Sequence, residues 1–297
     1  MRKYNIRPSK SWGQNFLINK DIKERIISAS YIKKDELVIE IGAGLGVLSR
    51  ELAAGAGWLV AIEADKHLVP ALEEALRDYK NVLIINNDIL KLDIKNDVIS
   101  VACRIAHERN EVGSVKDGVF IPACIKVIGN LPYYITTPII MKLLEEEPGI
   151  DEIIFMVQKE VADRILAEPG TKDYGSLSVA VRYYSKPEIM FNVPPSAFIP
   201  RPKVYSTVIR LNINKKPPVQ LVDRSLFFKI VKAAFSQRRK TLANALFNAN
   251  LFSFGKEEIK RILGSLEIPG IDENARGEEL SIFQFAQLSN MISQKLN

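Results

Sequence analysis

Residues 36–46 read "ELVIEIGAGLG", and this stretch decides the fold. A short apolar run ends in three glycines, Gly42, Gly44 and Gly46, where a helix is expected to begin. Glycine permits a tight turn and lets a ligand approach the backbone closely. The spacing G-x-G-x-G differs from the dinucleotide fingerprint G-x-G-x-x-G, which disfavours a nicotinamide oxidoreductase. Glu40, just before the turn, fits poorly beside a pyrophosphate and better beside a cationic ligand.

Short apolar runs alternate with helical stretches outward from this turn. Strands are expected at 36–42, 58–63, 81–86, 125–130 and 152–158, and helices at 65–79 and 136–147. This alternation predicts an α/β fold with a doubly wound, Rossmann-like, mostly parallel sheet and helices on both faces. Two later strands, at 187–193 and 205–211, are expected to finish the sheet as an antiparallel pair.

The character of the sequence changes at "NKKPPVQ", residues 214–220, which reads as a linker. Beyond it the pattern is helical, with helices expected at 224–235, 238–248, 256–263 and 278–288. We therefore predict a catalytic domain at 1–212 and a smaller, all-helical C-terminal domain at 213–297. The segment 91–123 is long, polar and mixed in charge; it is hard to assign, and a solvated loop or a short helix is the interpretation that we favour.

Composition excludes several classes of protein. The 297 residues carry a net charge of +6, which hints at a polyanionic partner such as nucleic acid. No apolar run approaches the roughly 20 residues of a membrane span. The basic N-terminus lacks the apolar segment of a secretory signal, and two cysteines make no disulfide framework, so we expect a cytoplasmic protein. Two histidines and two cysteines are too few to suggest a metal site.

The ends of the first three strands together suit an adenosine without phosphates. The first offers the glycine turn at Gly42 and Gly44, and the second ends in Glu63, an acceptor for both hydroxyls of a ribose. The third runs into Asp88, an acceptor for an adenine amino group. Any one of these residues alone is often just a turn or a helix cap. Their order along the sheet favours a binding site.

The fourth strand ends in "NLPYY", residues 130–134. An adenine amino group is a poor nucleophile, and a protein assists it by accepting hydrogen bonds from both of its N–H groups. Asn130 offers a side-chain oxygen and Leu131 a backbone carbonyl, since Pro132 biases the preceding residue to an extended conformation. Tyr133 offers a flat face on which a base stacks. The alternative is a strand terminated by proline, with tyrosines packed in the core.

A basic cluster lies in the helical region. Lys229, Lys232 and the run 238–240, Arg-Arg-Lys, form it, and no acidic residue interrupts 227–246. Such a cluster suits phosphates. The alternative is a solvated helix face with Val231, Ala234 and Leu242 packed inward, and the two interpretations are compatible. Four more cations, Arg2, Lys3, Arg7 and Lys10, form a basic N-terminal arm.

The sequence resembles the small-subunit ribosomal RNA adenine N6-dimethyltransferases, which use S-adenosylmethionine. The matching motifs are "SWGQNFL" (11–17), "EIGAGLG" (40–46), "IEAD" (62–65), "NND" (86–88), "GNLPYYITTPI" (129–139), "MVQKEVADRI" (156–165), "YGSLSV" (174–179), "VPPSAFIPRPKVYS" (193–206) and "FSQRRKTLANAL" (235–246). "NLPY" is shared with other amine methyltransferases, whereas "GQNFL" with "FSQRRKTL" is specific. The match covers nearly the whole chain.

This resemblance implies roles for individual residues. Asn15 and Leu17 would lie over the cofactor, and Gly42 and Gly44 would line its methionine side. Glu63 would hold the ribose, Asp88 the adenine, and Asn130 would bridge the cofactor and the target amine. Tyr133 would stack on the target base, with Phe198 as a second aromatic wall. The target would be two adjacent adenines in the 3′-terminal hairpin of 16S rRNA, dimethylated by a monomer during late small-subunit assembly.

Two features depart from the family pattern, and three rival functions stay open. Trp12 stands where a smaller residue is usual, and 91–123 exceeds the usual family length. One rival is a large-subunit adenine methyltransferase of the antibiotic-resistance type, disfavoured by "FSQRRKTL" and the long C-terminal region. The others are an RNA-binding assembly factor in which methylation is secondary, and a nicotinamide oxidoreductase.

Overall fold

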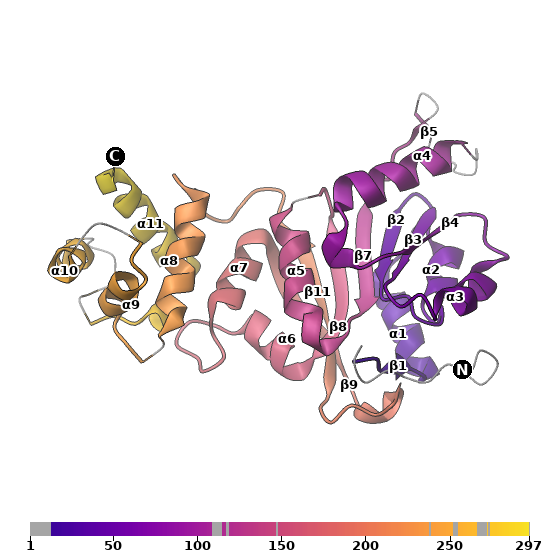
Figure 1. Ribbon diagram of the computed structural model, residues 1–297, viewed down its shortest axis with the longest axis horizontal. Coiled ribbons are helices and arrows are strands. Elements are labelled where there is room, and N and C mark those ends of the chain that lie inside the picture. The colour runs from indigo at the N-terminus through magenta and orange to yellow at the C-terminus, as the bar shows by residue number, and fades with distance from the viewer. Residues whose placement is uncertain are drawn as a thin grey trace. The chain divides into compact units, whose positions relative to one another are not determined.

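The computed structural model describes residues 13–108, 115–116, 119–146, 148–237, 239–251, 255–265, 272 and 274–296. Contacts between Cα atoms divide the chain into two compact units (Figure 1). Unit 1 comprises Met1–Ala162 and Glu188–Ile213, and unit 2 comprises Asp163–Pro187 and Asn214–Asn297. The chain passes from unit 1 to unit 2 for the last time between Ile213 and Asn214, and the sequence places the boundary near residue 213. Unit 2 also contains Asp163–Pro187, and the boundary between functional domains stays a prediction.

A seven-stranded sheet forms the centre of unit 1 and confirms the expected fold class. Its order is β4-β3-β2-β7-β8-β11-β9. The strands are β2 (Leu37–Ile41), β3 (Trp58–Glu63), β4 (Val82–Asn86), β7 (Ile125–Asn130), β8 (Glu152–Gln158), β9 (Ser185–Val193) and β11 (Ser206–Ile213). The first five are parallel, and β11 runs antiparallel to β8. The strands that are parallel to both neighbours are largely buried and mostly apolar, as expected when helices cover both sides.

The strand order reverses between β2 and β7. From β2 the chain builds outward through β3 and β4, and it returns on the other side of β2 as β7 and then β8. In such sheets a ligand binds at the carboxyl ends of the strands, at this switch point. Ile41 lies opposite Gly129 in the register, so Gly42, the first residue after β2, lies beside Asn130, the last residue of β7.

Three helices cover one face of the sheet. These are α1 (Lys20–Ser30), α2 (Ser49–Gly55) and α3 (Val69–Leu76), whose buried residues share one core cluster with alternate residues of the strands. The helix expected from residue 65 begins only at Val69. Asp65 forms a turn instead, because its side chain accepts from His67 N at 3.0 Å and its carbonyl from Leu68 N at 2.9 Å.

The stretch 91–123, expected to be a solvated loop or a short helix, contains more regular structure than that. It follows η2 (Ile89–Lys91) and contains the π-helical η3 (Ile94–Ile99), α4 (Ser100–Glu108), β5 (Val115–Lys116) and β6 (Val119–Phe120). Ala102 and Ala106 of α4 are buried, and α4 contacts β3. After β7 come η4 (Tyr133–Ile135), α5 (Thr136–Glu145) and, after β8, α6 (Lys159–Leu166).

A short two-stranded sheet joins the N-terminal segment to a distant loop. Strand β1 (Phe16–Leu17) pairs antiparallel with β10 (Phe198–Ile199), which follows η5 (Pro195–Ala197). Ile18 N and Asn19 N both donate to Ala197 O, at 2.9 and 3.3 Å. The first described residues of the chain are thereby held at the carboxyl edge of the large sheet.

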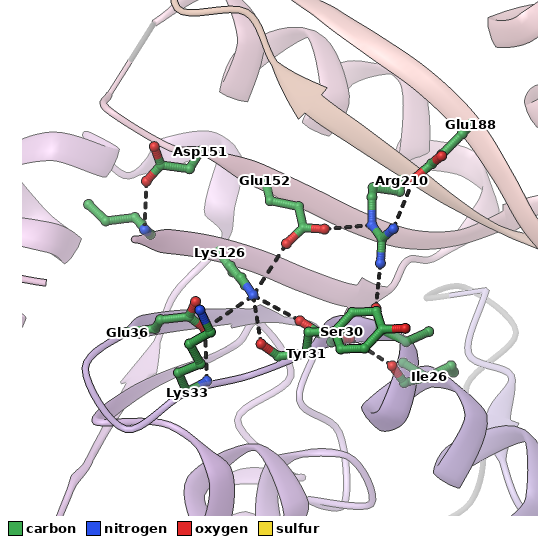
Figure 2. A network of polar contacts seen from close by, with 12 residues as sticks. Ile26, Ser30, Tyr31, Lys33, Glu36, Lys126, Asp151, Glu152, Glu188 and Arg210 are labelled. Atoms are coloured by element: carbon green, nitrogen blue, oxygen red, sulfur yellow. Dashed lines mark hydrogen bonds and ion pairs between the residues drawn. The ribbon is translucent and has the colours of Figure 1, made fainter. Parts of the chain in front are cut away.

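A buried ionic network holds the opposite end of the strands (Figure 2). Lys126 Nζ, at the start of β7, pairs with Glu36 at 3.1 Å and with Glu152 at 3.4 Å. It also donates to the carbonyls of Ser30 and Tyr31, at 2.9 and 3.1 Å, at the C-terminal end of α1. Arg210 extends the network with ion pairs to Glu152 and Glu188 and a hydrogen bond to Ala29 O. One lysine therefore joins three strand starts to a helix end.

Unit 2 contains α7 (Ser176–Tyr184), α8 (Arg224–Ser236), α9 (Leu242–Asn248), α10 (Lys256–Gly264), η6 (Gly277–Glu279) and α11 (Ile282–Leu296). The helices expected from 238 and 278 begin later, at Leu242 and Ile282. Thr241 caps the first of them by accepting from Asn244 N. Aromatic residues of α7 and α8 pack together, with Tyr184 stacked on Phe228. No helix among the described residues has the length and apolarity to cross a membrane.

Candidate active site

The glycine turn after β2 packs closely against a helix at its last glycine and leaves space beside its first glycine. Gly42, Gly44 and Gly46 have φ of 76°, 58° and 76°, a region that L side chains rarely adopt. A Cβ at Gly46 would lie 2.9 Å from Ala75 Cβ, so this glycine serves the packing of α3. A Cβ at Gly42 would meet only Asn130 O, at 3.6 Å. The first glycine therefore leaves its backbone open to a ligand.

Glu63, at the end of β3, has a carboxylate of fixed direction. Its Oε2 accepts from Gly44 N at 2.7 Å and its Oε1 from Asp65 N at 2.8 Å. Burial raises the pKa of Glu63, and these backbone hydrogen bonds oppose the rise. Each oxygen keeps a second lone pair, so the carboxylate suits two neighbouring hydroxyl groups.

Glu40 is a second buried carboxylate beside the turn, with 2 % of its surface exposed. Burial raises its pKa to about 8; the neighbouring Ser49 hydroxyl opposes this rise and the charge of Glu63 adds to it. Its Oε2 has no hydrogen-bond partner among the described residues. A cation bound nearby would favour the ionised form. Glu40 thus agrees with the expectation of a cationic ligand at this turn.

Asp88 follows β4 and caps η2. Its Oδ1 accepts from Leu90 N at 3.0 Å, which directs the side chain at the start of the short helix. Asn87, Ile89 and Leu90 line the same cavity as Asp88. A polar acceptor bordered by apolar side chains is an arrangement suited to the edge of a purine base.

The side-chain amide of Asn130 has an assigned direction. Its Nδ2 donates to the backbone carbonyl of Asn15 at 2.9 Å. A carbonyl only accepts, so the nitrogen must face Asn15, and Oδ1 keeps its accepting capacity for another donor. The adjoining Leu131 is buried, and Leu131 and Pro132 line the cavity with Asn130.

One cavity brings together most of the expected site residues. Those that line it are Asn15, Leu17, Gly42, Gly44, Glu63, Asp88, Asn130, Leu131 and Pro132. They come from four strand ends and from the N-terminal segment, which lie far apart in the sequence. The order of the strands in the sequence predicted that the strand ends would converge.

The two expected aromatic walls do not line this cavity. Tyr133 is half-buried, and its hydroxyl lies 2.7 Å from Ser206 Oγ, which fixes the direction of the ring. Phe198 is 0 % exposed and packs in the core cluster with Leu17, because β10 pairs with β1. A stacking role for Phe198 would require β10 to move, and both aromatic roles stay predictions.

Among the cavity-lining residues that sequence reasoning missed, four concern the N-terminal segment and its surroundings. Gly13, Gln14 and Phe16 belong to the N-terminal segment, and Tyr134 follows the NLPY motif. Gly13 has a φ of 54°. The isolated glycine before "QNFL" was the available signal for a close contact at this point.

The fold and the site define a class of protein. A sheet of this order, with a glycine turn, a ribose-type acceptor and a terminal Asn-Leu-Pro-Tyr at the switch point, is that of a Rossmann-like methyltransferase. The ribosomal RNA adenine dimethylase family model matches residues 5–294, and the chain belongs to this family of S-adenosylmethionine-dependent enzymes. The fixed Glu63 carboxylate, the open backbone at Gly42 and the buried Glu40 suit the hydroxyl and cationic groups of that cofactor.

Curated relatives match along their whole length. A "Ribosomal RNA small subunit methyltransferase A" of Alkaliphilus metalliredigens is 46% identical over 295 residues, covering 99% of this chain and 95% of the relative. A protein of the same name from Clostridioides difficile is 46% identical over 297 residues, covering 100% and 95%. This chain as a whole is therefore no longer than these two relatives. Overall coverage does not measure the length of one segment, so the expectation that 91–123 exceeds the usual family length stays a prediction.

Solved structures agree on the fold. A dimethyladenosine transferase from Plasmodium falciparum gives a TM-score of 0.72 at 24% identity, covering 94% of this chain and 98% of that one. The 23S rRNA methyltransferase ErmE gives 0.64 at 23% identity, covering 94% and 100%. At such identities the likeness concerns the architecture, so it does not choose between substrates.

Proposed function

We propose that this enzyme transfers methyl groups from S-adenosylmethionine to N6 of two adjacent adenines near the 3′ end of 16S rRNA. The names of the relatives, which are 46% identical over the full length, support the choice of the small subunit. The observation that carries the chemistry is the direction of the Asn130 amide, whose nitrogen is held by Asn15 O.

Asn130 and Leu131 would act on the target amine. The cofactor supplies an electrophilic methyl group on a positively charged sulfur. Asn130 Oδ1 and Leu131 O would accept the two N–H groups of the adenine amine, which directs its lone pair at the methyl group. The amine becomes acidic only as the new N–C bond forms, so no general base is needed beforehand. Catalysis would then rest on positioning and on electrostatic support of developing charge.

The remaining cavity residues would hold the cofactor. Glu63 would accept both ribose hydroxyls, which its two backbone hydrogen bonds orient it to do. Asp88 would accept from the adenine amino group, and Gly42 and Gly44 would border the methionine part. Asn15 and Leu17 would cover the cofactor from the N-terminal side. Glu40 would face its cationic groups.

The target adenine must leave its stack to reach Asn130. Single-stranded or loop RNA makes this inexpensive, and aromatic side chains then hold the base. Tyr133 would stack on it, an interaction worth about 1–3 kcal/mol per base. Phe198 would add a second wall only if β10 shifts, since the ring is fully buried.

Unit 2 would supply phosphate contacts. Lys229, Lys232, Arg239 and Lys240 are exposed, while Val231, Ala234 and Leu242 are buried, so the basic face and the packed face of this region are separate. Arg238 and the basic arm at Arg2, Lys3, Arg7 and Lys10 lie outside the described residues. We further propose that the enzyme acts as a cytoplasmic monomer on the immature small subunit, in late assembly.

Mass spectrometry of rRNA tests this proposal. Purified enzyme and S-adenosylmethionine are incubated separately with immature small subunits and with large subunits that lack the modification. We expect two adjacent N6-dimethyladenines near the 3′ end of 16S rRNA and none in large-subunit RNA. Methylation confined to the large subunit would support the antibiotic-resistance type of enzyme instead. Full rescue of an assembly defect by an inactive Asn130→Ala variant would make methylation secondary to assembly.

A further inference from the structure

Residues 13–17, which we call the strap, line the cavity and are tied to three separate elements. Phe16 and Leu17 pair with β10. Gln14 Nε2 donates to Asp65 Oδ2 at 2.9 Å, next to Glu63. Asn15 O accepts from Asn130 Nδ2 at 2.9 Å, and Asn15 Nδ2 donates to Gly13 O at 3.2 Å. All five residues line the cavity.

Tyr134 contacts the strap at its first residue. Gly13 has a φ of 54°, and a Cβ placed there would lie 3.2 Å from Tyr134 Cδ1 and 3.5 Å from Cε1. The aromatic ring therefore packs against the bare backbone of a glycine. Burial raises the pKa of Tyr134, and the negative charge of Asp88 adds to the rise.

Tyr134 is 56% exposed although it borders the cavity. Its neighbour Tyr133 is held by Ser206, and Tyr134 follows in the same 3₁₀ turn. A large aromatic ring that is mostly exposed stabilises the protein only through the residues that it packs against, and Gly13 is one of these. Nothing in the chemistry assigned to Asn130 and Leu131 uses this ring.

We propose that Tyr134 is a positioning residue, which clamps the strap over the cavity and so keeps Asn15 O against the Asn130 amide. This inference rests on the proposed role of Asn130. If the strap lifted, the amide would be free to turn and to present its NH₂ group to the target amine, a donor facing a donor. The clamp would also slow the departure of a ligand bound beneath the strap.

The test compares Tyr134→Ala with Tyr134→Phe, which keeps the ring and removes the hydroxyl. Protein labelled with ¹⁵N-asparagine is examined by NMR, and the Asn130 side-chain signal is assigned with Asn130→Asp. We expect the Asn130 NH₂ protons to exchange with water about tenfold faster in Tyr134→Ala, equal to about 1.4 kcal/mol, and at the wild-type rate in Tyr134→Phe. Equal exchange in Tyr134→Ala and wild type would overturn the proposal.

Release of S-adenosylhomocysteine, measured without RNA, gives a second readout. Its dissociation should be about tenfold faster in Tyr134→Ala and within about twofold of wild type in Tyr134→Phe. Fast release in both variants would assign the effect to the hydroxyl and overturn the clamp. If neither S-adenosylhomocysteine nor S-adenosylmethionine binds to the wild type or to either variant, the proposed function is wrong. The NMR measurement still tests the role of Tyr134 in that case.

A double substitution separates the clamp from general damage. In Gly13→Ala the new methyl group would push the Tyr134 ring and strain a residue at positive φ. Gly13→Ala should therefore destabilise the wild type more than it destabilises Tyr134→Ala, where the ring is absent. Equal losses in melting temperature in the two backgrounds would show that the ring does not press on Gly13, against the proposal.

Discussion

At the scale of single residues, backbone groups fix the direction of the polar side chains in the cavity. Two backbone N–H groups hold the Glu63 carboxylate, and one backbone carbonyl holds the Asn130 amide. Glu40 differs, because its buried carboxyl keeps an oxygen without a hydrogen-bond partner among the described residues. Such a group costs free energy until a ligand compensates it. The protonation of Glu40 should therefore affect the stability of the protein when no cofactor is bound.

Glu40→Gln should remove a pH-dependent loss of stability from the cofactor-free protein. The pKa of Glu40 is raised from 4.5 to about 8, so between these pH values the folded protein holds a proton that the unfolded chain releases. The stability that the protonated Glu40 contributes to the folded protein is fully present below about pH 4.5. It is lost at up to about 1.4 kcal/mol per pH unit as pH rises to about 8.

Thermal melts of wild type and Glu40→Gln across this pH range check the prediction. The advantage of the variant should grow up to about pH 8 and then level off. Glu51→Gln is the matched control, because the Lys23 hydrogen bond lowers the pKa of the exposed Glu51. Its small effect should have the opposite sign and change only below about pH 4.5, the ordinary pKa of Glu51. Parallel pH profiles for wild type and Glu40→Gln would contradict the account.

Sequence patterns predicted the site residues at the ends of the strands and missed Gly13 and Tyr134, which meet at the cavity. Glu63, Asp88 and Asn130 were found because the carboxyl ends of parallel strands share one edge. Tyr134 was missed because its contact with Gly13 joins segments more than a hundred residues apart. The burial of Phe198 follows from the pairing of β1 with β10, for which two-residue strands give no periodic signal.

At the scale of elements, β7 is held at both ends. Asn130 is tied to the strap at its carboxyl end, and Lys126 is tied to α1, Glu36 and Glu152 at its start. The ammonium group of Lys126 also caps α1, since it donates to Ser30 O and Tyr31 O at the end of that helix. A charge so buried requires all these partners.

Lys126→Met should destabilise the protein by about 3–5 kcal/mol, because it leaves the Glu36 carboxylate buried without its cation. Urea denaturation measures the loss. Adding Glu36→Gln should restore part of it. The control is Lys23→Met, which removes an ion pair at 2.7 Å with the more exposed Glu51 and should cost at most about 1 kcal/mol. A cost for Lys126→Met no larger than that of the control would refute the structural role of the network.

The boundaries of elements were predicted well where apolar residues define them. β3 and β8 begin and end at the expected residues. The start of α3 was misplaced because the Asp65 side chain satisfies the backbone of a turn, which hydrophobic spacing does not register. The Lys126 network was not predicted at all, since a single lysine within an apolar strand reads as a solvent-facing position.

At the scale of the whole molecule, the proposed roles divide between the two units. Unit 1 carries every residue assigned to the cofactor and the target amine, and unit 2 carries the exposed basic face. Composition and the linker predicted a second, helical domain. They did not indicate that α7 is part of unit 2, because α7 comes before β9 and β11, two strands of the large sheet, in the sequence.

Lys232→Gln combined with Arg239→Gln should weaken RNA binding and flatten its salt dependence. The slope of log K against log salt should fall in magnitude by about 1 for each phosphate that the variant no longer neutralises. Filter binding of small-subunit RNA at several salt concentrations gives this slope. Lys260→Gln is the control, since Lys260 of the same unit already pairs with Glu257 at 3.2 Å. An unchanged slope in the double variant would exclude this face from the RNA interface.

Single-turnover methyl transfer by Asn130→Ala tests the central claim most directly. Labelled S-adenosylmethionine and immature small subunits are supplied at saturation, and Asn81→Ala serves as control, since Asn81 donates to Ala53 O at 3.0 Å and does not line the cavity. Removing one directed polar group from the reacting amine should slow transfer by about 100-fold or more in Asn130→Ala. Asn81→Ala should transfer at the wild-type rate while melting lower. Transfer by Asn130→Ala within about threefold of wild type would contradict the account.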